Sequence, residues 1–311
     1  MLAFEDNVFV DSKTIKYNPV LVNDILICVR NGSRRLIGKN TIIKQEYEGL
    51  AFGAFMMVYR SEYNQFLQHA FKTDIFYWEV HRNLGATINS INGGNLKKFK
   101  VPFPPLPEQQ KIAEILSKWD ELIEEQEKLI KAKEQQKKGL MQKLLTGELR
   151  FPGFDGEWEE VRMSDISTIN QGLQIAISKR FTEPGPDRYF YITNEFLKKN
   201  SSYEYYVEAP TKSVLCDESD ILMTRTGNTG KVVTGVQGAF HNNFFKVAYD
   251  RSRIDRMFLF YLLNSEFIQN TIGRLAGTST IPDINHSDFY SILFNLPEIE
   301  EQVKISNLIA K

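Results

Sequence analysis

The sequence is poor in cysteine and histidine, with two and four of them among 311 residues. Cys28 and Cys216 stand without a CxxC pair or a neighbouring histidine, so the sequence indicates neither a disulfide framework nor a zinc site. We expect both thiols to be free and buried. The histidines lack HExxH spacing, and no GxSxG motif marks a nucleophile. The sequence therefore predicts no catalytic apparatus and no metal site.

The chain also lacks a long apolar run and an excess of positive charge. No segment approaches the roughly 20 apolar residues that span a bilayer, and the N-terminal residues lack the basic and hydrophobic parts of an export signal. We therefore place the chain in the cytoplasm, with no membrane partner. The net charge is −1, whereas a chain that holds nucleic acid by bulk charge is basic. Any nucleic-acid site must be a local patch.

What the chain does contain is an internal repeat. Residues 87–116 align without a gap with residues 280–309, 193 positions later. The period is far longer than that of a solenoid repeat, so it predicts a duplicated domain. The identical pairs include Thr87/Thr280, Ile91/Ile284, Asn92/Asn285, Pro104/Pro297, Glu108/Glu301, Gln109/Gln302 and Lys111/Lys304.

The clearest single element is a helix that we predict from Pro107 to Leu145. Pro107 suits a first helical turn, and the Thr146-Gly147 pair supplies the stop. Such a helix would be on the order of 55–60 Å long, too long to be buried within one small domain. Apolar residues in three- and four-residue steps predict a coiled-coil seam for a partner helix. The seam residues are Ile112, Ile115, Trp119, Leu122, Leu129 and Leu140.

Matching strand-like segments lie on both sides of this helix. Residues 24–27 and 220–223 each lead into a glycine turn. The other matched segments are the strands at 55–59 and 245–249, and the amphipathic helices at 64–82 and 257–274. We therefore predict an α+β fold, with two similar β-rich domains separated by long coiled-coil helices. The second copy has a lead-in from Trp158, so we expect the first copy to lack roughly forty N-terminal residues by comparison.

Two similar domains without catalytic motifs favour the reading of a DNA sequence. The candidate loops are rich in the side chains that bond to base edges or phosphates, although a solvated loop residue is the commoner role for any one of them. The candidates for base reading are Arg30, Gln171, Gln174, Lys179, Arg225, Asn228, Lys231, Asn242, Asn243, Thr278, Ser279 and Thr280. The candidates for phosphate contact are Arg34, Arg35, Lys39, Arg180, Lys198 and Lys199.

Two stretches carry a resemblance to a known family. PLPEQQKIAEIL enters the long helix, and KKGLMQKLLTGELRFPGFDGEWEEVRMSDI leaves it. Both closely resemble the specificity (S) subunit of type I restriction-modification systems, and the likeness extends over essentially the whole chain. It implies two target-recognition domains, at 1–101 and 151–294, with the first one N-terminally incomplete. It also implies a conserved spacer helix at 102–150 and the start of a second conserved helix at 295–311.

The resemblance further implies double-stranded DNA as a partner, together with type I methyltransferase (modification) subunits that dock on the conserved helices. A motor/nuclease (restriction) subunit would join through the complex. This chain would hold no cofactor, because S-adenosylmethionine belongs to the methyltransferase. One alternative is a truncated fragment that self-associates through the seam, or pairs with a complementing S fragment, without reading a target itself.

Overall fold

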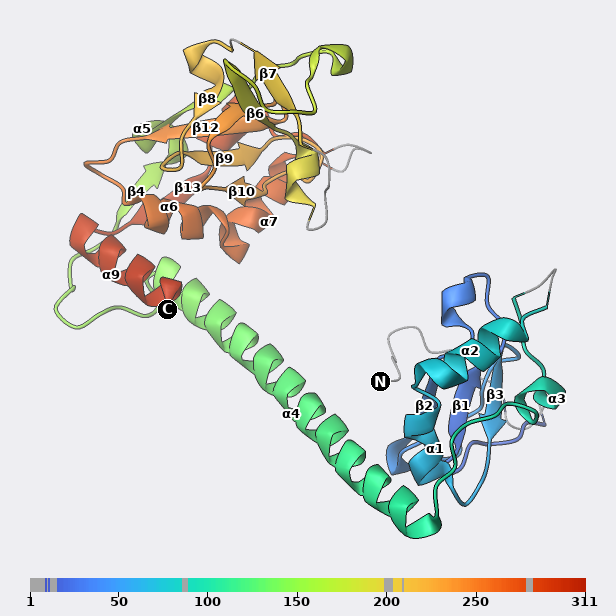
Figure 1. The fold of residues 1–311 in the computed structure, drawn as a ribbon. Coiled ribbons are helices and arrows are strands. Elements are labelled where there is room, and N and C mark those ends of the chain that lie inside the picture. Colours follow the sequence, from blue (N-terminus) through green and yellow to red (C-terminus); the bar gives the residue numbers. More distant parts are fainter. Residues whose placement is uncertain are drawn as a thin grey trace. The chain divides into compact units, whose positions relative to one another are not determined.

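The computed structural model describes Phe9, Asp11 and residues 16–85, 89–198, 204–208, 210–277 and 282–311. The chain forms two compact units, which divide between Ile130 and Lys131. The division falls within helix α4 (Leu106–Leu145), which is continuous (Figure 1). This helix confirms the predicted one to within a residue at its start. Among the described helices, none has the length and apolar character needed to cross a membrane.

The first unit is built on a small antiparallel sheet of order β2-β1-β3. Ile25 and Ile27 of β1 are fully buried in one core, whereas Leu26 belongs to a second cluster, as side-chain alternation along a strand requires. The elements are β1 (Ile25–Cys28), η1 (Arg34–Leu36), β2 (Asn40–Ile42), η2 (Gln45–Tyr47), β3 (Met56–Tyr59), α1 (Asn64–Ala70), α2 (Asp74–Arg82) and α3 (Gly93–Leu96).

The second unit contains two four-stranded sheets and a two-stranded ladder. The first sheet has the order β10-β9-β12-β5, the second β7-β6-β11-β8, and β13 pairs with β4. The strands are β4 (Glu159–Arg162), β5 (Ser167–Gln171), β6 (Arg188–Ile192), β7 (Tyr206–Glu208), β8 (Leu215–Cys216), β9 (Ile221–Thr224), β10 (Val232–Val233), β11 (Gly238–Phe240), β12 (Phe244–Tyr249) and β13 (Leu293–Leu296).

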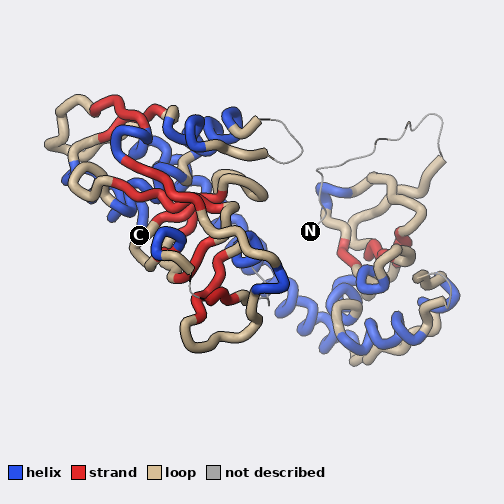
Figure 2. The backbone as a smooth tube through the Cα atoms, turned by 90° about the horizontal axis from the view of Figure 1, so that it is seen from above, coloured by secondary structure: helices blue, strands red, loops and turns tan. Residues whose placement is uncertain are grey.

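Helices accompany the strands of the second unit (Figure 2). They share its main core with the sheet β10-β9-β12-β5. Phe245 of β12, Phe258 and Phe289 are fully buried there. The helical elements are α5 (Met163–Ile166), η3 (Ile177–Lys179), η4 (Asn194–Leu197), η5 (Lys212–Val214), α6 (Arg256–Leu263), α7 (Glu266–Leu275), α8 (His286–Tyr290) and α9 (Ile299–Ala310).

The predicted helices at 64–82 and 257–274 are each two helices, which corrects the sequence interpretation. The first is interrupted before Thr73, whose hydroxyl donates to the carbonyl of Ala70. The second is interrupted at Ser265, whose hydroxyl accepts from the Ile268 N–H and starts α7. Side chains of this kind bond to the backbone at helix ends, and an apolar periodicity does not reveal the break.

The two units repeat the same local devices. The order β2-β1-β3 matches β10-β9-β12. Asn92 and Asn285 each cap a short helix by accepting a backbone N–H. Gln109 donates to the carbonyl of Pro104 at 2.7 Å, and its counterpart Gln302 donates to Pro297 at the same distance.

Both cysteines are free, as predicted. Cys216 is buried, and this burial raises the pKa of its thiol to about 11. Cys28, the last residue of β1, is only half-buried, because the strand runs out of the core toward an exposed loop.

Candidate nucleic-acid interface

The candidate residues of the second unit gather at one end of the sheet β10-β9-β12-β5. Phe245 of β12 lies opposite Gln171, the last residue of β5, and Phe244 lies opposite Thr224, the last residue of β9. The loop at 225–231 and the turn at 241–243 therefore emerge at the same end of the sheet as Gln171. The Arg225 N–H donates to the carbonyl of Asn243 at 2.7 Å, which joins the loop to the turn.

Three predicted residues form an amide cluster there. Asn242 donates from Nδ2 to Oε1 of Gln174 at 3.0 Å, and Gln171 donates from Nε2 to the Asn242 carbonyl at 3.5 Å. A Cβ on Gly172 would lie 2.3 Å from the carbonyl oxygen of Phe240, so only glycine allows this close approach. The side chains of Gln171 and Gln174 remain exposed, and amides of this kind can pair with the edge of adenine.

The loop at 225–231 is held in place by neighbouring side chains. Asn194 donates to the Gly227 carbonyl at 2.8 Å, and Gln269 donates to the Gly230 carbonyl at 2.8 Å. Gly227 has φ +64°, a value that favours glycine. Asn228 and Lys231 are exposed and border an open hollow of about 510 Å³. The loop is therefore a fixed platform that presents these two side chains.

Arg225 is placed differently from its loop neighbours. Its guanidinium donates to both carboxylate oxygens of Asp283, at 2.9 and 2.6 Å, and lies 5.8 Å from the ring centre of Phe245. The Asp283 carboxylate raises the pKa of Arg225. Arg225 is half-buried, so its charge is largely compensated within the protein.

Arg180 is also engaged inside the second unit. Its guanidinium lies over the rings of Tyr191 and Tyr205, at 5.2 and 5.5 Å, and donates to the Ile175 carbonyl at 3.3 Å. The arginine is half-buried, which suits support of the fold better than phosphate contact. It also lies close to His241, whose pKa is lowered by burial and by this positive charge.

The remaining candidate lysines of the second unit are not members of the amide cluster. Lys179 ends η3 and is exposed, and Lys198 forms an ion pair with Glu195 at 2.8 Å. Lys199, Thr278, Ser279 and Thr280 lie outside the residues that the structure describes.

The first unit presents the clearest basic patch, between β1 and β2. Arg30, Arg34, Arg35 and Lys39 are all exposed, and residues 30–39 contain no Asp or Glu. The patch occupies the position that the loop at 225–231 has in the second unit, because β1 and β9 are equivalent strands. A local patch of this kind is what a chain with a net charge of −1 needs to meet phosphates.

The repeat also shows a difference in charge beside the two loops. Ser90 forms an isolated bridge with Arg30, and its counterpart Asp283 forms one with Thr226. Ser90 therefore stands where the second unit has the carboxylate that engages Arg225. Arg30 itself is the counterpart of Thr226, and the counterpart of Arg225 is Val29.

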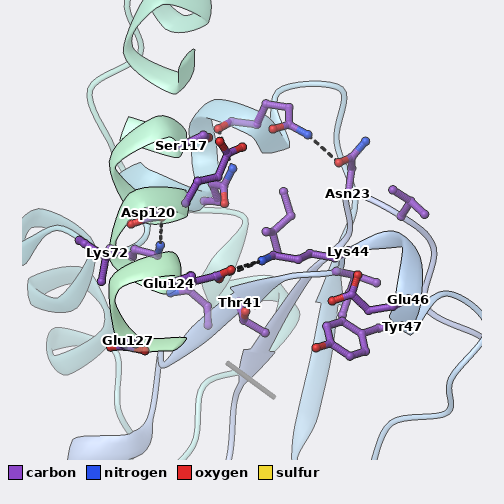
Figure 3. A pocket seen from close by; sticks show the side chains of 18 of the residues that line it. Asn23, Thr41, Lys44, Glu46, Tyr47, Lys72, Ser117, Asp120, Glu124 and Glu127 are labelled. Atoms are coloured by element: carbon purple, nitrogen blue, oxygen red, sulfur yellow. Dashed lines mark hydrogen bonds and ion pairs between the residues drawn. The ribbon is translucent and has the colours of Figure 1, made fainter. Parts of the chain in front are cut away.

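The helix α4 has a second candidate surface, for a protein partner. One face is attached to the first unit through Glu124 with Lys44 at 2.7 Å and Asp120 with Lys72 at 2.9 Å (Figure 3). The Glu124 carboxylate raises the pKa of Lys44, and burial lowers the pKa of nearby His69. These contacts fix one face of the helix against the sheet.

The predicted seam lies mainly on the other face of α4. Ile115, Trp119, Leu122, Leu129 and Leu140 are exposed, with Trp119 at 62%. Ile112 is the exception, because it packs against the core of the first unit. Exposed apolar side chains that recur on one face of a helix indicate an interaction site.

Sequence reasoning missed several residues that shape these sites. Asn194 and Gln269 hold the loop at 225–231 from distant parts of the chain, and nothing in their local sequence marks this role. The alignment of the repeat does show that Asp283 replaces Ser90, and this difference could have indicated a partner for a cation in the second unit.

Comparisons with known proteins agree with this architecture. The model of the type I restriction-modification DNA specificity domain matches residues 8–134 and 155–311. The MjaVIII type I restriction enzyme specificity subunit of Methanocaldococcus jannaschii is 27% identical over 70% of this chain and 56% of its own length. The StySPI specificity subunit of Salmonella potsdam is 23% identical over 96% of this chain and 70% of its own length.

A solved chain from a study of complex assembly and conformational transition in a type I restriction-modification system has a similar fold. Its TM-score is 0.62, with 19% identity over 94% of this chain and 74% of that chain.

Proposed function

This chain belongs to the type I restriction-modification DNA specificity family, and we propose that it supplies the DNA sequence specificity of a type I complex. Its partners would be double-stranded DNA, methyltransferase subunits and, through the complex, a restriction subunit. The chain spans 56% of the length of the MjaVIII relative and 70% of the length of the StySPI relative.

The observation that carries the proposal is the matched position of the two polar loops. Each follows the central strand of an equivalent sheet, and each presents side chains suited to nucleic acid. The loop of the first unit offers Arg30, Arg34, Arg35 and Lys39 for phosphate and guanine contacts. The second offers amides at Gln171 and Gln174 with exposed Asn228 and Lys231.

We assign the chemistry to the partners and not to this chain. Methyl transfer from S-adenosylmethionine would occur in a methyltransferase subunit, and this chain would position that subunit on a chosen sequence. The exposed apolar stripe of α4, which includes Trp119 and Leu122, supports a protein partner along this helix.

Selection from a random DNA pool tests the proposal. The chain and its methyltransferase subunits are titrated with the pool, and the bound DNA is separated by electrophoretic shift and sequenced. We expect enrichment of a defined motif, and methylome sequencing with and without the gene should report the same motif. Retention of DNA without any enriched motif would contradict a specificity role.

The second candidate function is a non-reading interaction protein that associates through α4. The exposure of Ile115, Trp119, Leu122 and Leu129 is the observation that favours it. In this case the loop arginines would not affect complex formation, whereas changes in the stripe would.

A further inference from the structure

Two strand edges that are paired in the second unit have no strand partner among the described residues of the first unit. In the second unit, β4 pairs with β13 and β5 pairs with β12. Residues 100–103 are the counterpart of β13, and β3 is the counterpart of β12. Within the described part of the first unit, no strand pairs with 100–103, and β3 is an outer strand of its sheet.

In the second unit, the segment before β4 is anchored on α9. Arg150 donates from Nε and Nη2 to the two carboxylate oxygens of Glu301, each at 2.8 Å, and Trp158 donates from Nε1 to the same carboxylate at 3.0 Å. Nζ of Lys304 lies 4.4 Å from the ring centre of Phe154. Glu301 is fully buried by these contacts.

The first unit keeps the anchoring residues but leaves them uncovered. Glu108 and Lys111 are the counterparts of Glu301 and Lys304, and both are exposed. Lys111 contacts Glu114 of its own helix at 2.9 Å. Phe103 is 53% exposed, whereas its counterpart Leu296 is 5% exposed. The Phe103 ring also packs edge-on against Tyr63 and Phe66. The counterparts of the anchoring groups are therefore exposed next to a strand edge that has no partner among the described residues.

Pro102 does not prevent strand pairing at this edge. In the second unit, the Met163 N–H donates to the Ile292 carbonyl at 3.0 Å, in register with β4 and β13. Hydrogen-bonded pairs alternate along an antiparallel ladder, so Asn295 stands at a non-hydrogen-bonded position. Pro102 is the counterpart of Asn295, and the missing N–H would cost no ladder bond there.

We propose that this edge of the first unit binds a strand segment of a separate polypeptide, of the type that the chain carries at 150–171. The arginine and tryptophan of the incoming segment contact Glu108, and its phenylalanine lies on Lys111. Its first strand pairs with 100–103 and its second with β3, which is strand addition to an exposed sheet edge. A cleft of about 620 Å³ lined by Phe52, Met56 and Met57 borders β3.

The test uses a fluorescent peptide with the sequence of residues 148–171, titrated into the full chain and followed by anisotropy. We expect saturable binding that Glu108→Ala weakens at least about tenfold, because a charge-assisted bidentate pair is lost. Glu125→Ala, at an exposed position of the same helix, is the matched control and should leave binding unchanged. A peptide with Arg150→Ala should bind as weakly as the wild-type peptide binds the Glu108→Ala protein.

Hydrogen exchange with the peptide bound locates the site. We expect new protection at 56–59 and 100–103. Absence of saturable binding, equal affinity for the Glu108→Ala protein, or protection confined to the second unit would each overturn the proposal. The inference depends on the repeat and not on DNA reading, so failure to select a DNA motif would leave this result unaffected.

Discussion

Asp283 binds the guanidinium of Arg225 through both of its carboxylate oxygens, at 2.9 and 2.6 Å. The repeat places Ser90 at the equivalent position beside Arg30. The counterpart of Arg225 in the first unit is Val29, because the Ile91 N–H donates to the Val29 carbonyl as its counterpart, the Ile284 N–H, donates to the Arg225 carbonyl. The first unit therefore has neither this arginine nor its carboxylate, and its Arg30 is exposed. The two units thus present different electrostatic surfaces on the same scaffold.

Asp283→Ala is expected to destabilise the second unit by about 1 kcal/mol. The value is modest because Arg225 and Asp283 are 23% and 41% exposed and solvent screens the pair. Urea denaturation followed by the emission of the partly buried Trp158 measures the change. Glu183→Ala, at an exposed position of the same unit, serves as the control, and equal effects of the two substitutions would refute a role for the ion pair.

The double substitution Arg34→Gln with Arg35→Gln is expected to weaken DNA binding uniformly across sequences. If both side chains neutralise phosphates, the slope of log K against log salt should fall in magnitude by about two. Arg225→Gln is the comparison, and it should change the slope less because Asp283 already compensates this charge. DNA binding is titrated with salt for the wild type, the double substitution and Arg225→Gln. An equal change of slope for Arg225→Gln would show that the exposure of an arginine does not determine whether it contacts phosphate.

Glu301→Gln is expected to destabilise the second unit by about 3 kcal/mol, because the buried carboxylate compensates Arg150 and accepts from Trp158. The exposed counterpart Glu108→Gln should stay within about 0.5 kcal/mol of the wild type. Urea titration followed by circular dichroism, which reports on both units, compares the two. A similar cost at both positions would mean that Glu108 already has an equivalent partner.

The first unit is expected to lose stability in acid through Asp24. Two hydrogen bonds from Arg60, at 2.7 Å each, hold the pKa of Asp24 below its ordinary value of 3.8. A depressed pKa in the folded state gives stability that is present above pH 3.8 and is lost as the pH falls through the folded pKa. Urea titrations at descending pH should show that the free energy of unfolding falls. In Asp24→Asn this fall with pH should be absent. An unchanged pH dependence in Asp24→Asn would exclude this carboxylate as the cause.

Trp119→Asp is expected to abolish association with methyltransferase subunits while the chain stays folded, because this side chain is 62% exposed. Size-exclusion chromatography of the mixed subunits measures the association, and circular dichroism checks the fold. Lys128→Asp, an exposed position on the same helix, is the control. Loss of self-association alone would favour the interaction-protein alternative.

The sequence predicted the parts of the fold that depend on periodicity and duplication. The apolar steps from Ile112 to Leu140 and the stop at Thr146-Gly147 located α4. The repeat aligned Gln109 with Gln302, and both side chains donate to the carbonyl of the proline that precedes their helix. The breaks before Thr73 and at Ser265 were missed, because side-chain bonds to the backbone cause them and the hydrophobic pattern does not change there.

The sequence located the loops of the candidate interface, but it did not reveal which of their cations are held by partners inside the protein. Arg180 and Arg225 are of a residue type that commonly binds DNA. In the structure, however, Arg180 lies over the ring of Tyr191, and Arg225 forms an ion pair with Asp283. These partners are distant in sequence, so only the fold reveals which cations are compensated. Arg34, Arg35 and Lys39 lie in the loop between β1 and β2, and the absence of acidic residues from 30–39 was visible from the start.

Asn194 and Gln269 hold the loop at 225–231 by its backbone carbonyls and not by its side chains. Exchange of Lys231 for another residue would therefore leave these two bonds intact. If the loop contacts bases, as we propose, substitution at its exposed positions would change the base preference while its backbone stays in place. On the proposed function, a library randomised at Lys231, with Asn194 and Gln269 kept, would therefore yield altered targets.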